Sequence, residues 1–159
     1  MADAIVVPDG EVPGGLNLLR ALNPAHYGVD GLPGPGHFVM RLDHEPDDGV
    51  STGIEALINV TQMRELKVIN GPYGESYGVA VLNVAEILEP VKGTEIKVIQ
   101  QDAREWELFS HAHAIITGYQ RFPSGSAGRK KIQEFRRHLV KLAQRRYFPP
   151  GSTTEVRGD

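Results

Sequence analysis

Turn-forming residues divide this chain into short apolar runs, and the shortness of these runs limits the folds that the chain can adopt. The chain holds 18 Gly and 11 Pro among 159 residues, and seven Gly and five Pro fall within the first 36. Most of the apolar runs between these turns have the length of a strand. One segment, at about residues 129–147, has the length and period of a long helix.

That segment predicts a basic, amphipathic helix near the C-terminus. Its apolar residues recur at spacings of three and four, which places them on one helical face. They are Ile132, Phe135, Leu139 and Leu142. Pro149 and Pro150 follow and end the helix.

The remaining runs predict short strands and one further helix. Residues 54–63 have helical spacing, and Thr52 with Glu55 fits a capping box at their start. Residues 102–109 are compatible with a short helix or a loop. The segments expected as strands are 16–22, 37–42, 66–69, 79–87, 95–100 and 111–117. This mixture predicts one α+β domain over residues 14–148, with flexible segments at 1–13 and 149–159.

Composition excludes several classes of protein. Hydrophobic residues make up 40% and charged residues 23%, as in ordinary globular domains. The absence of cysteine excludes a disulfide framework, thiolate metal sites and cysteine nucleophiles. His111 and His113 would share one face of a strand and could bind a metal, but no third ligand is evident, so no metal site is expected. No apolar run approaches about 18 residues, so no membrane span is expected. The first residues do not resemble a signal peptide, so the cytoplasm is the expected starting compartment.

Charge is distributed unevenly along the chain. Residues 129–159 hold nine Lys or Arg and three Asp or Glu, whereas residues 1–128 hold eight and 17. A basic end on an acidic body indicates an anionic partner, or docking of the end on its own body. Nucleic acid is a possible partner, but aromatic residues do not interleave with the charges as a stacking surface requires. An acidic protein partner is therefore favoured.

The residues that carry most chemistry are spread along the chain. Arg20 lies in the first expected strand, Ser51 and Thr52 precede the first expected helix, and Glu105-x-Glu107 precedes the strand with His113. An arginine can bridge dinucleotide phosphates, a hydroxyl can hold a ribose, and a carboxylate can stabilise an oxocarbenium-like transition state. This order suits binding of NAD and cleavage of its nicotinamide bond. The structural alternatives are an ion pair, a helix cap and a solvated helix face.

Four segments carry a resemblance to a known group of proteins. They are residues 16–21 (LNLLRA), 49–52 (GVST), 96–102 (IKVIQQD) and 111–116 (HAHAII), followed by the basic helix. In this order they are similar to small cytotoxic effectors of bacterial type VI secretion, whose fold resembles that of ADP-ribosyltransferase toxins. The resemblance implies a split β-core around a cleft for NAD, the substrate. It also implies delivery from the producer's cytoplasm to that of a competing cell, with a cognate immunity protein and a secretion-apparatus carrier as partners.

The resemblance also assigns roles to individual residues. Arg20 corresponds to the strand arginine, and Ser51 and Thr52 correspond to the first two positions of a Ser-Thr-Ser motif. Gly53 stands at the third position of that motif. Glu105 and Glu107 have the spacing of the catalytic glutamates of arginine-modifying transferases, provided that they begin the strand that follows.

Two histidines complete the candidate site, and two other functions remain open. His37 is an alternative pocket residue, and His113 is a candidate for acid–base work. One alternative function is a non-enzymatic interaction module, such as an immunity or adaptor protein, with the basic helix as its contact surface. The other is an RNA-directed toxin that uses His111 or His113. Toxicity of the induced chain separates an enzyme from an interaction module.

Overall fold

The computed structural model describes residues 10–28, 30–45, 48–69 and 76–158. Within this part of the chain, seven strands form one antiparallel sheet in the order β4-β5-β2-β1-β3-β6-β7. The strands are β1 (Asn17–Leu22), β2 (Val50–Ile54), β3 (Gly78–Asn83), β4 (Lys97–Gln100), β5 (His113–Thr117), β6 (Arg146–Phe148) and β7 (Val156–Arg157). The protein is therefore an α+β protein built on a single sheet, as the sequence predicts.

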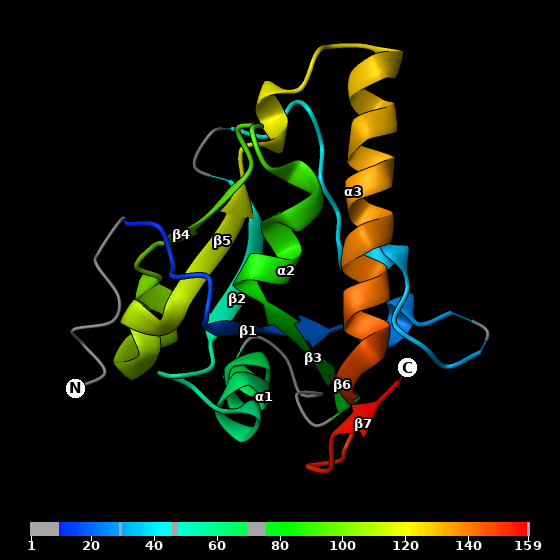
Figure 1. Ribbon diagram of the computed structural model, residues 1–159. Helices are drawn as coiled ribbons and strands as arrows, with labels where there is room; N and C mark the ends of the chain where they lie inside the picture. The colour runs from blue at the N-terminus through cyan, green and yellow to red at the C-terminus, as the bar shows by residue number, and fades with distance from the viewer. Residues whose placement is uncertain (1–9, 29, 46–47, 70–75, 159) are drawn as a thin grey trace.

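Helices cover both faces of this sheet (Figure 1). The α-helices are α1 (Val60–Ile69), α2 (Val84–Leu88) and α3 (Ser126–Arg145). A kinked 3-10 segment, Arg104–Ala112, connects β4 to β5. Residues of α2 and α3 pack on one face of the sheet, and residues of α1 and the 3-10 segment pack on the other.

The sheet opens between its two central strands. β1 pairs with β3 through six residue pairs, but it pairs with β2 through only two, Leu18↔Ile54 and Leu19↔Gly53. Beyond these pairs β1 and β2 separate, and in Figure 1 β1 and β3 run across the direction of β2 and β5. Arg20 lies on β1 directly after the last pair, at the point where the strands part.

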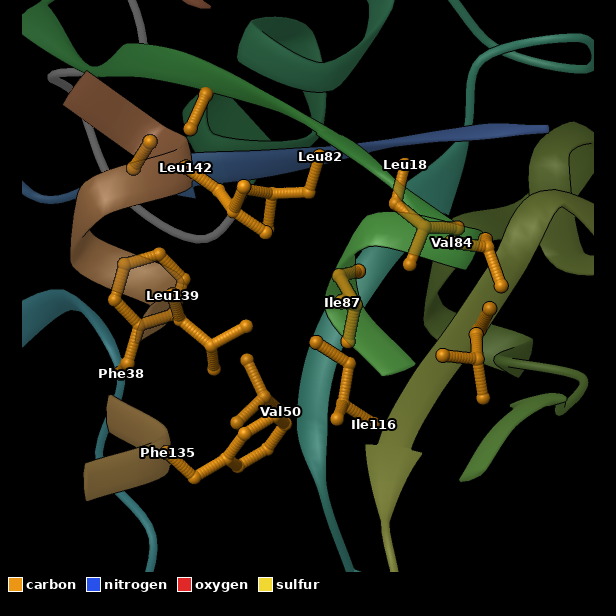
Figure 2. Close-up of a cluster of buried hydrophobic side chains, with 14 of the residues drawn as sticks. Leu18, Phe38, Val50, Leu82, Val84, Ile87, Ile116, Phe135, Leu139 and Leu142 are labelled. Carbon is orange, nitrogen blue, oxygen red and sulfur yellow. The ribbon is translucent and has the colours of Figure 1, made fainter. Parts of the chain in front are cut away.

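The larger core lies between α3 and the sheet. The inward face of α3 consists of the apolar residues whose spacing predicts the helix, Ile132, Phe135, Leu139 and Leu142. Figure 2 shows Phe135, Leu139 and Leu142 beside side chains of the sheet and of α2. Because Leu139 is fully buried, this face anchors α3 to the sheet.

A second core lies on the opposite face. It joins Leu19 of β1 and Val81 of β3 to Met63 of α1 and to Trp106 of the 3-10 segment. Adjacent residues of β1 thus serve different cores, since Leu18 belongs to the α3 side and Leu19 to the Trp106 side. This division follows from the alternation of side chains along a strand.

Several predicted elements are confirmed. The strand expected at residues 16–22 is β1, and those expected at 95–100 and 111–117 are β4 and β5 with shorter bounds. The long helix is α3, although it starts and ends earlier than residues 129–147. Residues 102–109 are mostly helical. The strand expected at 79–87 is half right, because α2 begins at Val84 after Asn83 caps it.

Three predictions of secondary structure are wrong. Residues 37–42 do not form a strand, because they follow a 3-10 turn and run beside α3. Residues 66–69 belong to α1 and not to a strand. The helix expected at 54–63 begins only at Val60, so Thr52 and Glu55 do not cap it.

The true start of α1 is set by a different capping box. The Asn59 side chain accepts from the Gln62 N–H at 2.8 Å, and the Gln62 side chain accepts from the Asn59 N–H at 2.9 Å. This reciprocal pair satisfies two backbone donors at the helix start. The β-branched residues before it, in turn, fit the buried strand β2.

Both ends of the described chain pair with the sheet. Glu11 bridges Ile99 on the outer side of β4, and Val156–Arg157 pairs with β6 as β7. The segments expected to be flexible thus include paired residues, while residues 1–9 lie outside the described part. No helix in the described ranges is long and apolar enough to cross a membrane.

Candidate functional site

The centre of the candidate site is a hydrogen bond between Ser51 of β2 and His113 of β5. Their strands are neighbours, with Ser51 opposite Ile115 and Gly53 opposite His113. Ser51 Oγ lies 2.8 Å from His113 Nε2. The imidazole is buried, whereas Ser51 is partly exposed. Of the two residues, Ser51 is thus the more accessible to solvent.

A backbone carbonyl fixes the protonation pattern of the pair. His113 Nδ1 lies 2.8 Å from the carbonyl oxygen of Gln101. A carbonyl only accepts, so Nδ1 carries the proton, and in the neutral ring Nε2 accepts from the Ser51 hydroxyl. A hydroxyl, a basic nitrogen and an orienting acceptor in this order form the arrangement that activates a hydroxyl in many enzymes.

Trp106 covers the imidazole. Its ring lies edge-on to His113 with 4.7 Å between the ring centroids. Trp106 belongs to the 3-10 segment and is buried. Its position limits the rotation of His113 and keeps one side of the ring dry.

The two glutamates flank Trp106 and point away from it. Glu105 and Glu107 are exposed, and they lie in the 3-10 segment and not in the strand that follows. Glu107 has a positive φ of 50°, which marks a kink within the segment. The condition under which these glutamates match the transferase pattern, that they begin the strand, is therefore not met.

Arg20 spans the opening between β1 and β2. Its Nη1 donates to the Ser51 carbonyl at 2.8 Å, and its Nε and Nη2 donate to the His37 carbonyl at 3.0 and 2.9 Å. Burial lowers the pKa of Arg20 to about 10, so the guanidinium stays charged at neutral pH. Since both acceptors are uncharged, these bonds orient the positive charge without neutralising it. The guanidinium retains further N–H donors for an anionic acceptor.

His37 supports Arg20 through its backbone, while its ring is held on both sides. The Gly34 N–H donates to Nδ1, so Nε2 carries the proton and donates to the Asn23 carbonyl at 2.9 Å. The ring also packs edge-on against Tyr27. Desolvation lowers the pKa of His37, which keeps the ring neutral. His37 is thus placed beside Arg20 as a structural residue of the site.

Thr52 lies beside Ser51 but faces the other core. It is fully buried, and its hydroxyl donates to the Ala114 carbonyl at 2.9 Å. Its strand neighbours Val50 and Ile54 belong to the α3 side. Of the seven candidate residues, the structure brings only the side chains of Ser51 and His113 together. Arg20 lies on the α3 face of β1 and reaches this pair only through the Ser51 carbonyl, while His37 lies beside Arg20. Thr52, Glu105 and Glu107 lie elsewhere.

A second histidine of the same strand region has a different partner. His111 Nδ1 lies 2.9 Å from Asp102, which also accepts from the Gln100 side chain. These two bonds lower the pKa of Asp102, that from Gln100 first. His111 and His113 therefore do not share a ligand position. Among the described residues, no cluster of His, Asp and Glu could hold a metal ion.

Sequence reasoning missed two contributors to this site. Gln101 acts through its backbone carbonyl, which no side-chain pattern can reveal. Trp106 is the one tryptophan of the chain and lies between Glu105 and Glu107 in the sequence. A lone tryptophan beside two candidate residues is a signal in the sequence that could have indicated its place against His113.

Comparisons with known proteins add no relative to this picture. No protein-family model, no curated protein and no solved structure matches the chain.

Proposed function

We propose that this chain is an NAD-consuming enzyme related to ADP-ribosyltransferase toxins, which acts as an antibacterial effector in the cytoplasm of a target cell. The observation that carries the proposal is the Ser51–His113 hydrogen bond beside the strand arginine, where β1 and β2 part. The opening between these strands agrees with the split β-core that the resemblance implies. The location of Arg20 on β1 and of Ser51 on the neighbouring β2 supports the proposal, since the resemblance assigns them to a strand arginine and to the start of a Ser-Thr-Ser motif.

The proposed reaction breaks the bond between the nicotinamide nitrogen and C1′ of the ribose. Nicotinamide leaves with the bonding electron pair, and an oxocarbenium-like centre develops at C1′. Water, or an acceptor group of another molecule, then forms the new bond to C1′. With water the products are ADP-ribose, nicotinamide and one proton; with an acceptor, the ADP-ribosylated acceptor replaces ADP-ribose.

Ser51 and His113 are suited to remove the proton of the attacking group. The attacking group donates to Ser51 Oγ while the serine proton passes to His113 Nε2 over the 2.8 Å contact. The Gln101 carbonyl stabilises the resulting imidazolium through Nδ1–H. In this scheme His113 performs the acid–base work, since Glu105 and Glu107 are exposed on the 3-10 segment. Arg20 supports this pair indirectly, because its guanidinium holds the Ser51 backbone through the Ser51 carbonyl.

Induced expression in bacteria, with viable counts and cellular NAD followed together, tests the proposal. We expect the wild-type chain to deplete NAD and kill the cells. Ser51→Ala and His113→Gln should lower NAD consumption about 100-fold or more, as loss of acid–base catalysis does. The matched control is His111→Gln, which changes the same residue type two positions away and should retain activity.

Three outcomes contradict the proposal and separate its rivals. Unchanged NAD with degraded RNA identifies an RNA-directed toxin. A tolerated wild-type chain that captures a partner identifies an interaction module, such as an immunity or adaptor protein. Full activity in both site variants refutes the assignment of Ser51 and His113. Coexpression with neighbouring genes of the source genome tests the proposed immunity protein, because a cognate immunity protein should restore NAD.

A further inference from the structure

A groove of about 440 Å³ lies between the first half of α3 and the chain that runs beside it, on the face of the sheet away from the Ser51 hydroxyl. Its floor is apolar and consists of Met40, Leu42 and Ile132. Met40 and Ile132 are buried and Leu42 is partly buried, so the floor is continuous with the larger core. A ligand that fills this groove thus needs an apolar group.

Two arginines of α3 line the same groove. Arg136 is held in place, because its Nε donates to the Phe38 carbonyl at 2.9 Å and its Nη2 to the Met40 carbonyl at 3.3 Å. Both acceptors are uncharged, so the guanidinium is oriented but not neutralised by them. Arg129 is exposed at the groove, two turns before Arg136 on α3.

The charge around the groove is positive. Arg41 and Asp43 also line it, but they pair with each other at 2.8 Å and offset one another. Arg129 and Arg136 therefore remain as excess charge. The helix that bears them holds seven Lys or Arg and one Glu. An anionic ligand is favoured here, and the oriented Arg136 lowers the entropy cost of binding it.

We propose that this groove binds an acidic segment of a partner protein, which places an apolar side chain on the floor and carboxylates on Arg129 and Arg136. The apolar floor favours a peptide over nucleic acid, because a nucleic-acid strand needs phosphate contacts and stacking surfaces. No aromatic side chain is among the described residues that line the groove. The positive charge of the two arginines and the apolar floor together point to one occupant, an acidic peptide segment with an apolar side chain.

The groove lies on the opposite face of the sheet from the Ser51–His113 pair. α3 and the groove lie on the face that holds Leu18, Val50 and Ile54, whereas Ser51 and His113 lie on the face of Trp106. A partner in the groove does not need to cover the Ser51 hydroxyl. The inference therefore stands even if the chain is not an NAD-consuming enzyme.

Selection from a random peptide library displayed on phage, with the full chain as target, tests the proposal. We expect the enriched peptides to combine Asp or Glu with apolar residues. The affinity of a synthesised enriched peptide is then measured by fluorescence anisotropy. Arg129→Glu should weaken binding about tenfold or more, because charge reversal turns attraction for the peptide carboxylates into repulsion. Lys130→Glu is the matched control: it makes the same charge change at the next, exposed residue, outside the groove lining, and should have a much smaller effect.

Several results overturn the proposal. Failure to enrich any peptide, or enrichment of peptides without acidic residues, excludes this occupant. Equal weakening by Arg129→Glu and Lys130→Glu shows general attraction to the basic helix and not binding in the groove. If single-stranded RNA of mixed sequence binds and Arg129→Glu weakens that binding more than it weakens peptide binding, the groove serves nucleic acid. Both variants change exposed residues, so circular dichroism should show that each stays folded.

Discussion

Adjacent residues of β2 have different surroundings, because side chains alternate between the two faces along a strand. Ser51 faces His113 and Trp106, whereas Thr52 lies in the α3 core and bonds the Ala114 carbonyl. These two residues are adjacent in the sequence, but the strand turns their side chains to opposite faces of the sheet. Gly53 lies on the same face as Ser51, where neighbouring side chains leave no room for a Cβ at position 53.

A serine in place of Gly53 should therefore destabilise the protein. A Cβ at this position would lie 2.7 Å from Met63 Sδ and 2.8 Å from Ile58 Cγ2. We expect Gly53→Ser to lower the free energy of unfolding by about 1–3 kcal/mol, as overpacking does, with no gain in activity. Chemical denaturation measures this change. Gly15→Ser is the control, since a Cβ there meets no atom within 4 Å; equal stability of the two variants would refute the steric explanation.

His37 should make stability depend on pH. Burial lowers its pKa below the usual 6.5, so the unfolded chain binds a proton at a pH at which the folded chain does not. The free energy of unfolding should then fall as the pH drops through 6.5 toward the lower pKa of the folded state. In His37→Gln this contribution is lost. Denaturation at several pH values between about 7 and 5 checks this, and parallel curves for wild type and variant would contradict it.

At the level of elements, Arg20 replaces the backbone ladder where β1 and β2 part. Its guanidinium joins β2, through the Ser51 carbonyl, to the turn that ends at His37. The sequence predicts the strand that carries Arg20. It does not predict these partners, because carbonyl groups have no signature in a sequence and the opening depends on how two distant strands cross.

Arg20→Lys tests whether the fork shape of the side chain matters. A single ammonium group cannot occupy the positions of Nη1 and Nε together, so at least one carbonyl loses its donor. We expect the free energy of unfolding to fall by about 2 kcal/mol. Activity should fall as well, because the Ser51 backbone loses its support. Arg137→Lys, on the exposed face of α3, should change neither quantity in denaturation and NAD-consumption assays.

The predictability of the elements follows from how local their causes are. α3 is predictable because its apolar spacing and its length lie within the segment. Its end is not, because α3 stops at Arg145 and β6 follows before Pro149. The sequence places the start of α1 too early, because Thr52 and Glu55 fit the capping-box pattern as well as Asn59 and Gln62 do. In the structure Asn59 and Gln62 form the box. Residues 37–42 read as a strand, but they run beside α3, where Arg136 binds their carbonyls in place of a partner strand.

For the whole molecule, one sheet shared by two cores implies cooperative unfolding. Leu18 and Leu19 are neighbours on β1, yet each belongs to a different core. Loss of one core therefore removes the support of the strand on which the other depends. The single tryptophan, Trp106, lies in the smaller core and reports on that face alone.

Leu139→Ala, which acts on the opposite face from Trp106, tests this cooperativity. Leu139 is fully buried on α3, so its truncation should cost about 2–5 kcal/mol. We expect the Trp106 fluorescence transition and the circular dichroism transition to shift together by the same amount. A fluorescence transition that stays in place would show that the two faces unfold separately. Leu108→Ala, at a residue that is 93% exposed, should shift neither transition.

The pairing of residues 10–12 with β4 covers one edge of the sheet. Val12 N–H donates to the Val98 carbonyl, and Gln100 N–H donates to the Gly10 carbonyl, each at 2.9 Å. A shortened chain that begins at Gly14 would leave these groups of β4 without their partners and uncover apolar surface beside Val98. Open strand edges of this kind recruit strands from other molecules. We therefore expect a chain that begins at Gly14 to self-associate more readily than the full chain. Size-exclusion chromatography of the two forms measures this difference.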